Sequence, residues 1–127
     1  MATRRTKRLG ALIQAELALL LLKRIKEPRL KEVTITGVDV SPDLSQAKVF
    51  FSLLEESKVP EAIAGFQAAA PYLRRELAAR LQIKTTPRLI PVYDDSMARG
   101  AEMDELIRKV REEDKAHAQD RGDEDVS

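Results

Sequence analysis

The spacing of apolar side chains changes twice along this chain, and these changes restrict the fold more than any other feature. From about Thr6 to Lys26 leucine and isoleucine recur every three or four positions, which predicts an amphipathic helix. Pro28 ends this helix, because the residue before a proline is pushed out of the helical region. Leu19 and Leu22 widen the apolar stripe, so we expect one side of the helix to be heavily covered.

Two strands are predicted next. The segment from Val33 to Val40 is rich in β-branched residues and ends at the turn signal Ser41-Pro42-Asp43. Its apolar positions change parity at Gly37, and a β-bulge explains this because one extra residue inverts the facing of everything after it. The run from Ala47 to Leu53 then alternates between apolar and polar residues. A short turn joins the two runs, which predicts an antiparallel hairpin.

The helical period returns at Pro60 and continues to Leu81. Pro71 interrupts it, because proline lacks a backbone donor and clashes with the preceding turn. This predicts two helices, or one sharply kinked helix, meeting near Ala70 and Pro71. A third strand is predicted from Arg88 to Tyr93. Pro91 inside that strand cannot donate to a ladder, so its position must face an unpaired edge or a bulge.

A last helix is predicted to begin near Ser96. Residues 114–127 have almost nothing to bury, so we expect a disordered charged tail after a domain of residues 1–113. The element order is therefore α-β-β-α-kink-α-β with an extra C-terminal helix. A hairpin with helices on one face indicates a two-layer α+β domain.

Several functional classes are excluded by composition. The 127 residues suit one domain, and the absence of cysteine excludes a thiol nucleophile and a cysteine-ligated zinc site. The one histidine, His117, stands in the charged tail, away from any triad or metal site within the fold. The longest apolar run, Leu17 to Leu22, is far shorter than the about 20 residues of a membrane span. We therefore expect no catalytic residue, no cofactor, no metal and no membrane, and a reducing cytoplasm is compatible with this composition.

The net charge of +1 conceals a strong segregation of charge. Residues 1–31 hold nine basic and two acidic side chains, and residues 64–93 hold five basic and one acidic. Residues 32–63 hold two basic and six acidic side chains, and residues 94–127 hold six basic and twelve acidic. A folded domain with this order can present one positive face, which is the footprint expected for phosphate backbones, or it can present ordinary solvated faces.

Two basic sets are candidates for binding RNA phosphates. The first stands before and into the first helix and consists of Arg4, Arg5, Lys7 and Arg8. The second follows the kink and flanks the last strand, and it consists of Arg74, Arg75, Arg80, Lys84 and Arg88. The alternative for the first set is a solubilising terminus. A third group, from Lys23 to Lys31, follows the end of the first helix, where cations also stabilise the helix dipole.

Three strings, taken in order, resemble the ribosome-binding factor A family, bacterial factors of small-subunit assembly. EPRL at Glu27–Leu30 is similar to the family's word after the first helix. The string VTITGVDVSPDLSQAKVF at Val33–Phe50 resembles its strand and turn pattern, and TPRLIPVYDDSMARGAEMDEL at Thr86–Leu106 resembles its ending. The resemblance runs from about Thr6 to Leu106.

The resemblance implies a type II KH-like fold. Ordinary KH domains clamp nucleotides with a GxxG loop, but no two glycines of this chain are three positions apart. The family has an Ala-x-Gly kink instead, which falls here on Ala69, Ala70 and Pro71. Pro71 occupies the glycine position, and it keeps a kink through its fixed φ and missing N–H.

The resemblance also implies the function. It predicts a non-enzymatic ribosome assembly factor, acting as a monomer in the cytoplasm, that binds the free, immature 30S small ribosomal subunit. The expected contact is 16S rRNA in the region of its 5′-terminal helix, and the expected role is late 30S maturation and efficient 16S rRNA processing. The alternative is a protein-binding adaptor that recruits a basic partner through the acidic segment from Asp94 onward.

Overall fold

The structure is a computed structural model that describes residues 3–23 and 25–122, with side-chain detail for 3–23, 25–96 and 99–115. The chain divides into two units, residues 1–94 and 95–127, and each is described by itself. The first unit contains α1 (Arg4–Lys23), η1 (Pro28–Leu30), β1 (Thr34–Val40), β2 (Gln46–Ser52), η2 (Glu56–Lys58), α2 (Val59–Leu81) and β3 (Arg88–Tyr93). The second unit contains α3 (Ser96–Gly122).

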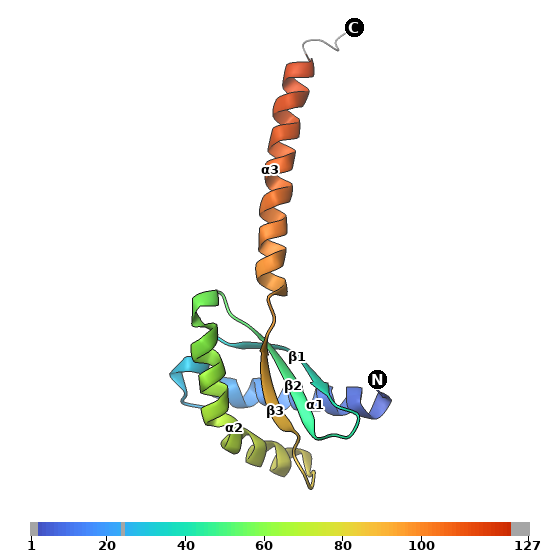
Figure 1. Cartoon of the computed structure of the whole chain (residues 1–127), viewed down its shortest axis with the longest axis vertical. Coiled ribbons are helices and arrows are strands. Elements are labelled where there is room, and N and C mark those ends of the chain that lie inside the picture. Colours follow the sequence, from blue (N-terminus) through green and yellow to red (C-terminus); the bar gives the residue numbers. More distant parts are fainter. Residues whose placement is uncertain (1–2, 24, 123–127) are drawn as a thin grey trace. The chain divides into compact units, whose positions relative to one another are not determined.

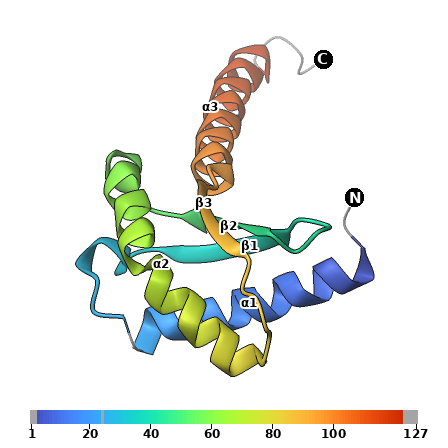
Figure 2. The same cartoon turned by 60° about the horizontal axis from the view of Figure 1, so that its bottom comes forward.

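The three strands form one sheet in the order β1-β2-β3. β1 and β2 pair antiparallel, which confirms the predicted hairpin, and β3 pairs parallel to β2 on its other side. Figure 2 shows α1 and the C-terminal half of α2 on one side of the sheet. The core lies between these two layers, and Phe51 at its centre contacts Phe66 of α2 and Tyr93 of β3, with ring centroids 5.2 and 5.8 Å away.

The change of apolar parity in β1 has the predicted cause. Ile35 pairs with Phe51, but Gly37 pairs with Phe50, the next residue back along β2, so Thr36 is the extra residue of a bulge. The bulge turns Val38 and Val40 to the same face as Ile35, because side chains after the inserted residue change face. Thr36 itself is exposed, and its Oγ1 donates to Asp94 Oδ2 at 2.7 Å.

The position of Pro91 on an open edge is also confirmed. Arg88 N donates to Ser45 O at 2.9 Å, and Asp94 N donates to Phe51 O at 2.7 Å, both on the β2 side. Because N–H groups alternate along a strand, the nitrogen of Pro91 faces away from β2. β3 is an edge strand, so no ladder bond is lost there.

Pro71 kinks one helix and does not divide it into two. α2 is continuous from Val59 to Leu81 with Pro71 inside it, and it changes direction midway in Figures 1 and 2. The missing N–H removes the hydrogen bond to the carbonyl of Gln67. Both Gln67 and Pro71 are exposed, so water reaches that carbonyl and the bend is tolerated.

Three expectations about the helices are wrong. The helix predicted from Thr6 starts at Arg4, because Thr3 provides its cap: Thr6 N donates to Thr3 Oγ1 and Thr3 N donates to Thr6 Oγ1. The wide apolar stripe is not covered, since Leu19 is 44% and Leu22 79% exposed. The core uses only the face that carries Ile13 and the other buried residues of this helix.

The third error concerns the C-terminal segment. α3 continues to Gly122, so residues 114–122 are helical where a disordered tail was predicted, and residues 123–127 lie outside the described residues. This stretch holds Lys115, Ala116, Ala118 and Arg121, which are good helix formers, and no proline. The two units meet at Asp94 and Asp95, and the apolar side chains described on α3, those of Met103, Leu106, Ile107 and Val110, are exposed. No helix among the described residues is long and apolar enough to span a membrane.

Because α1 approaches the sheet closely at Gly10, we expect any larger residue at this position to lower the stability of the fold. A Cβ added there would stand 2.7 Å from the backbone oxygen of Val38, which cannot move without disturbing β1. We expect Gly10→Ala to lower the free energy of unfolding by about 1–3 kcal/mol in urea titrations followed by circular dichroism. Gly100→Ala, where nothing lies within 4 Å, is the control, and equal effects of both would contradict the packing.

The turn between β1 and β2 predicts an unusual titration. Asp43 Oδ1 accepts from Ser41 Oγ and Ser45 Oγ at 2.7 Å each and from Ser45 N at 3.1 Å. The Ser41 bond, followed by those from Ser45, lowers the pKa of Asp43 from 3.8 to about 2. The carboxylate therefore contributes stability above pH 3.8 that is lost as the pH falls through 2.

NMR titration of the Asp43 carboxyl carbon tests this value. We expect a midpoint near pH 2 in the native chain and a rise toward 3.8 in Ser41→Ala. A native midpoint already at 3.8 would show that these hydrogen bonds do not hold the turn in solution.

Candidate nucleic-acid interface

The first predicted basic set lies in the opening turns of α1. Arg4, Arg5, Lys7 and Arg8 are all exposed, and they belong to the helix itself and not to an arm before it. Cations at a helix N-terminus are unfavourable, because the helix dipole is positive there. No ion pair joins these four side chains to a carboxylate of the described chain. Their placement therefore serves something other than helix stability, and an anion such as phosphate fits it.

Three members of the second predicted set are free cations, which means that they are exposed and have no ion-pair partner among the described side chains. Arg75 lies in the C-terminal half of α2, Lys84 lies between α2 and β3, and Arg88 is the first residue of β3. All three are exposed, and none has an ion-pair partner among the residues with described side chains. Arg88 pairs with Gln46, so it stands on the sheet face that is turned away from the helices.

The other two members are engaged in holding the fold together. Arg74 Nη2 donates to Thr86 O at 2.9 Å, and Thr86 Oγ1 donates back to Arg74 O at 3.1 Å. Arg80 lies between Glu16 of α1 and Glu76 of α2, at 3.3 and 3.5 Å. Sequence spacing gives no sign of the contacts with Thr86 and Glu16, because folding brings these partners close. Glu76, in contrast, lies one turn before Arg80 in the same helix.

The residues of the kink lie in the middle of α2. Ala69 and Ala70 are half-buried and Pro71 is exposed, so the outer side of the bend faces solvent. No sequence pattern marks Gly65 as important, but it has a packing role. A Cβ there would meet Arg29 Cβ at 3.0 Å and the side chain of Leu30 at 3.2 Å. It lets α2 approach η1 closely and does not provide a nucleotide clamp.

Folding brings the cations at the start of α1 and Arg88 at the start of β3 toward the same end of the first unit. Gly10, two residues after Arg8, lies against Val38 and Val40 near the end of β1. The turn after β1 bonds to the start of β3 through Ser45 and Arg88. The N-terminus of α1, this turn and the start of β3 accordingly lie toward the same end of the sheet in Figure 1. The arrangement is a positively charged end suited to phosphates.

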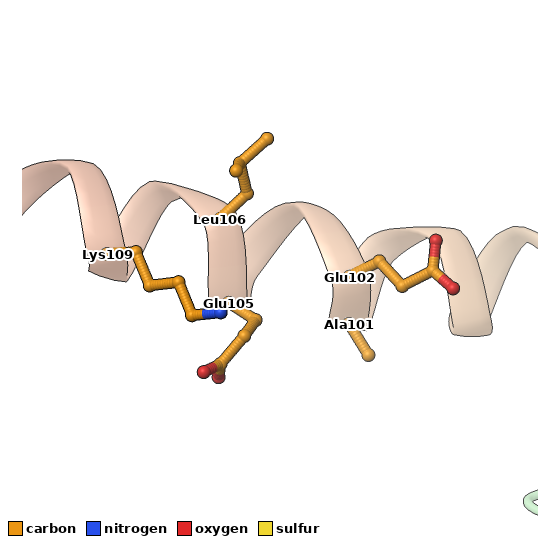
Figure 3. A pocket seen from close by; sticks show the side chains of 5 residues that line it. All are labelled: Ala101, Glu102, Glu105, Leu106 and Lys109. Atoms are coloured by element: carbon orange, nitrogen blue, oxygen red, sulfur yellow. The ribbon is translucent and has the colours of Figure 1, made fainter.

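The hollow found on α3 is not a small-molecule site. A hollow of about 370 Å³ lies on α3 alone, where Figure 3 shows its side chains spreading from a single helix, and it is lined by Ala101, Glu102, Glu105, Leu106 and Lys109. One helix surface cannot surround a small molecule. Within the described residues no group of three histidine, cysteine or acidic side chains is placed to hold a metal ion.

Comparison with known proteins gives consistent matches. A sequence model of the family described as ribosome-binding factor A matches residues 5–107. Ribosome-binding factor A of Stutzerimonas stutzeri is 43% identical over 123 residues, covering 94% of this chain and 95% of the relative. That of Thioalkalivibrio sulfidiphilus is 45% identical over 124 residues, covering 97% and 95%.

Solved structures agree. The crystal structure of ribosome-binding factor A from Thermus thermophilus matches with a TM-score of 0.62 and 26% identity, over 69% of this chain and 94% of that one. A Thermus thermophilus ribosome-binding factor A fitted into a cryo-EM map of a 30S complex matches with a TM-score of 0.50 and 26% identity, over 66% and 93%. These neighbours confirm the α+β fold expected from the element order and the KH-like fold that the resemblance implied. From residue 5 to residue 107, this chain belongs to the ribosome-binding factor A family.

Proposed function

We propose that this chain is a non-enzymatic ribosome assembly factor that binds the immature 30S subunit through its RNA. The observation that carries the proposal is the set of exposed cations that have no ion-pair partner among the described side chains, four of which lie at the positive end of the α1 dipole. Membership of the family supports the 30S subunit as the target, and a homology model of a relative has been fitted into a cryo-EM map of a 30S complex.

The proposed contact is 16S rRNA in the region of its 5′-terminal helix, and the proposed outcome is late 30S maturation and efficient processing of that RNA. The protein acts as a cytoplasmic monomer. It stabilises the RNA conformation that it binds more tightly, and cleavage belongs to a separate nuclease. Arg4, Arg5, Lys7 and Arg8 bind phosphates on one side, and Arg75, Lys84 and Arg88 bind them on another.

The kink contributes to the proposed RNA contact through the direction that it gives to α2. Pro71 offers no N–H to a phosphate, so RNA contact at this bend comes from the exposed ring and the neighbouring side chains. Arg75, one turn further along α2, is the nearest free cation of the proposed set. The bend therefore orients the half of α2 that carries it.

Reversal of one free cation tests the surface. We expect Arg75→Glu to weaken binding to 30S subunits on the order of tenfold and to reduce the slope of log K against log salt by about one. Because Arg75 has no described ion-pair partner, its loss leaves the fold intact. Co-sedimentation with subunits over a series of salt concentrations measures both quantities.

The matched control is Arg111→Glu, the same charge reversal at an exposed arginine of α3. It changes net charge equally but lies outside the proposed surface. If both variants bind subunits alike, or if Arg75→Glu leaves the salt slope unchanged, the assignment of Arg75 to the RNA surface fails.

A second candidate function is a protein-binding adaptor, and one observation on α3 favours it. Met103, Leu106, Ile107 and Val110 form a helical stripe, and they are 42–56% exposed. A monomer gains nothing by exposing such a stripe. The acidic character predicted for this segment is weaker over residues 96–115, which contain six acidic and five basic side chains.

The double change Leu106→Ser and Ile107→Ser in the full chain separates the two functions. If α3 binds a ribosomal protein, this variant loses affinity for 30S subunits and keeps its affinity for naked 16S rRNA, as measured by co-sedimentation and filter binding. Equal binding of the variant and the native chain to both targets would eliminate the adaptor.

A further inference from the structure

α1 carries a second apolar face, opposite the one that packs on the sheet. Leu12, Leu19 and Leu22 are 46%, 44% and 79% exposed, and the alanines between them are exposed as well. Leu12, Ala15, Leu19 and Leu22 are three or four residues apart, so they form one stripe along the helix. The buried residues Ile13, Leu17 and Leu20 lie on the other side of the same helix.

The stripe continues into a groove at the C-terminal end of α1. The groove has a volume of about 760 Å³ and lies between α1, η1 and the start of β1. Its lining includes the apolar side chains of Leu21, Leu22, Ile25, Leu30 and Val33 and the charged residues Lys26, Glu27 and Lys31. Stripe and groove share Leu22, so they form one continuous apolar surface.

The charge around this surface is uncompensated and positive. Lys23, Lys26 and Lys31 are exposed, and none pairs with a carboxylate in the part of the chain that the structure describes.

The nearby carboxylates are already engaged. Glu16 is bound by Arg80 at 3.3 Å, Glu27 by Arg29 at 2.7 Å, and Glu32 by Lys58 at 3.8 Å. The lysines are therefore available to a partner that brings its own negative charge.

A second copy of the chain is a poor occupant. α1 is basic at both ends, with Arg4 and Arg8 on the stripe side at its start and Lys23 at its end. Stacking two such helices places cations against cations in either the parallel or the antiparallel orientation, which costs free energy.

RNA is also a poor occupant of the groove. Its described lining contains no aromatic side chain on which a base could stack, and phosphates gain nothing from an aliphatic floor. The free energy that this surface offers comes from burial of leucine and isoleucine, which requires apolar side chains on the partner.

We propose that the outer face of α1 and the adjoining groove bind an acidic amphipathic helix of another protein. The apolar side chains of that helix, spaced three and four residues apart, fill the stripe and the groove. Its aspartate and glutamate side chains meet Lys23, Lys26 and Lys31. This interaction is independent of the proposed RNA contact, because it uses leucines that play no part in binding phosphate.

The test uses the full chain and a synthetic helical peptide that carries leucine at every third or fourth position and glutamate between. A peptide of the same composition with scrambled order is the control for periodicity. We expect the periodic peptide to bind in isothermal titration calorimetry and Leu22→Ser to weaken it at least about tenfold. Leu22 is mostly exposed, so the thermal melting of the variant remains that of the native chain.

Leu54→Ser is the matched control, because Leu54 is 92% exposed and lies outside the surface. We expect the double variant Lys26→Glu/Lys31→Glu to bind the periodic peptide more weakly. Lys48→Glu, outside the surface, is expected to bind it as the native chain does.

Three results overturn the proposal. In the first, the periodic peptide does not bind, or the scrambled one binds equally. In the second, sedimentation equilibrium shows a dimer that Leu22→Ser dissociates, so the occupant is a second copy. In the third, Leu22→Ser weakens binding to naked 16S rRNA as much as Arg75→Glu does, so the face belongs to the RNA surface.

Discussion

Packing around Phe51 is the interaction on which the rest of the first unit depends. This side chain is fully buried on the central strand, and rings from α2 and β3 close on it from two directions. Its backbone oxygen also accepts the hydrogen bond from Asp94 that ends the pairing of β3. Because one residue joins a helix to the parallel strand, the two-layer arrangement and the positions of the strand ends follow from it.

The same packing divides the arginines into two groups. Arg74 and Arg80 bond to partners outside their own turn of helix, and these bonds tie α2 to Thr86, two residues before β3, and to Glu16 of α1. Arg75, next to Arg74 in the chain, has no such partner and stays in solvent. A guanidinium that already donates to another group of the protein must release that contact before the same donor binds phosphate, so the free residues are the better candidates for an RNA surface.

α1 serves two chemistries on one helix. Its inner face supplies Leu17 and other buried leucines to the core, and its outer face exposes Leu12, Leu19 and Leu22. Its N-terminal turns carry cations that the helix dipole does not favour. The helix thus presents charge at its start and apolar area along its length, which suits two partners of different kinds.

Local patterns determined most of the architecture: the bulge at Gly37, the edge position of Pro91 and the start of α3 near Ser96 were all readable, because periodicity and proline chemistry act within a few residues. Tertiary structure alone decided which basic residues are free and which leucines are covered. The bond between Arg80 and Glu16 joins residues 64 positions apart, and Leu22 has the same apolar character as the leucines of the core. Side-chain character is local, whereas its partners and its burial depend on which distant elements pack beside it.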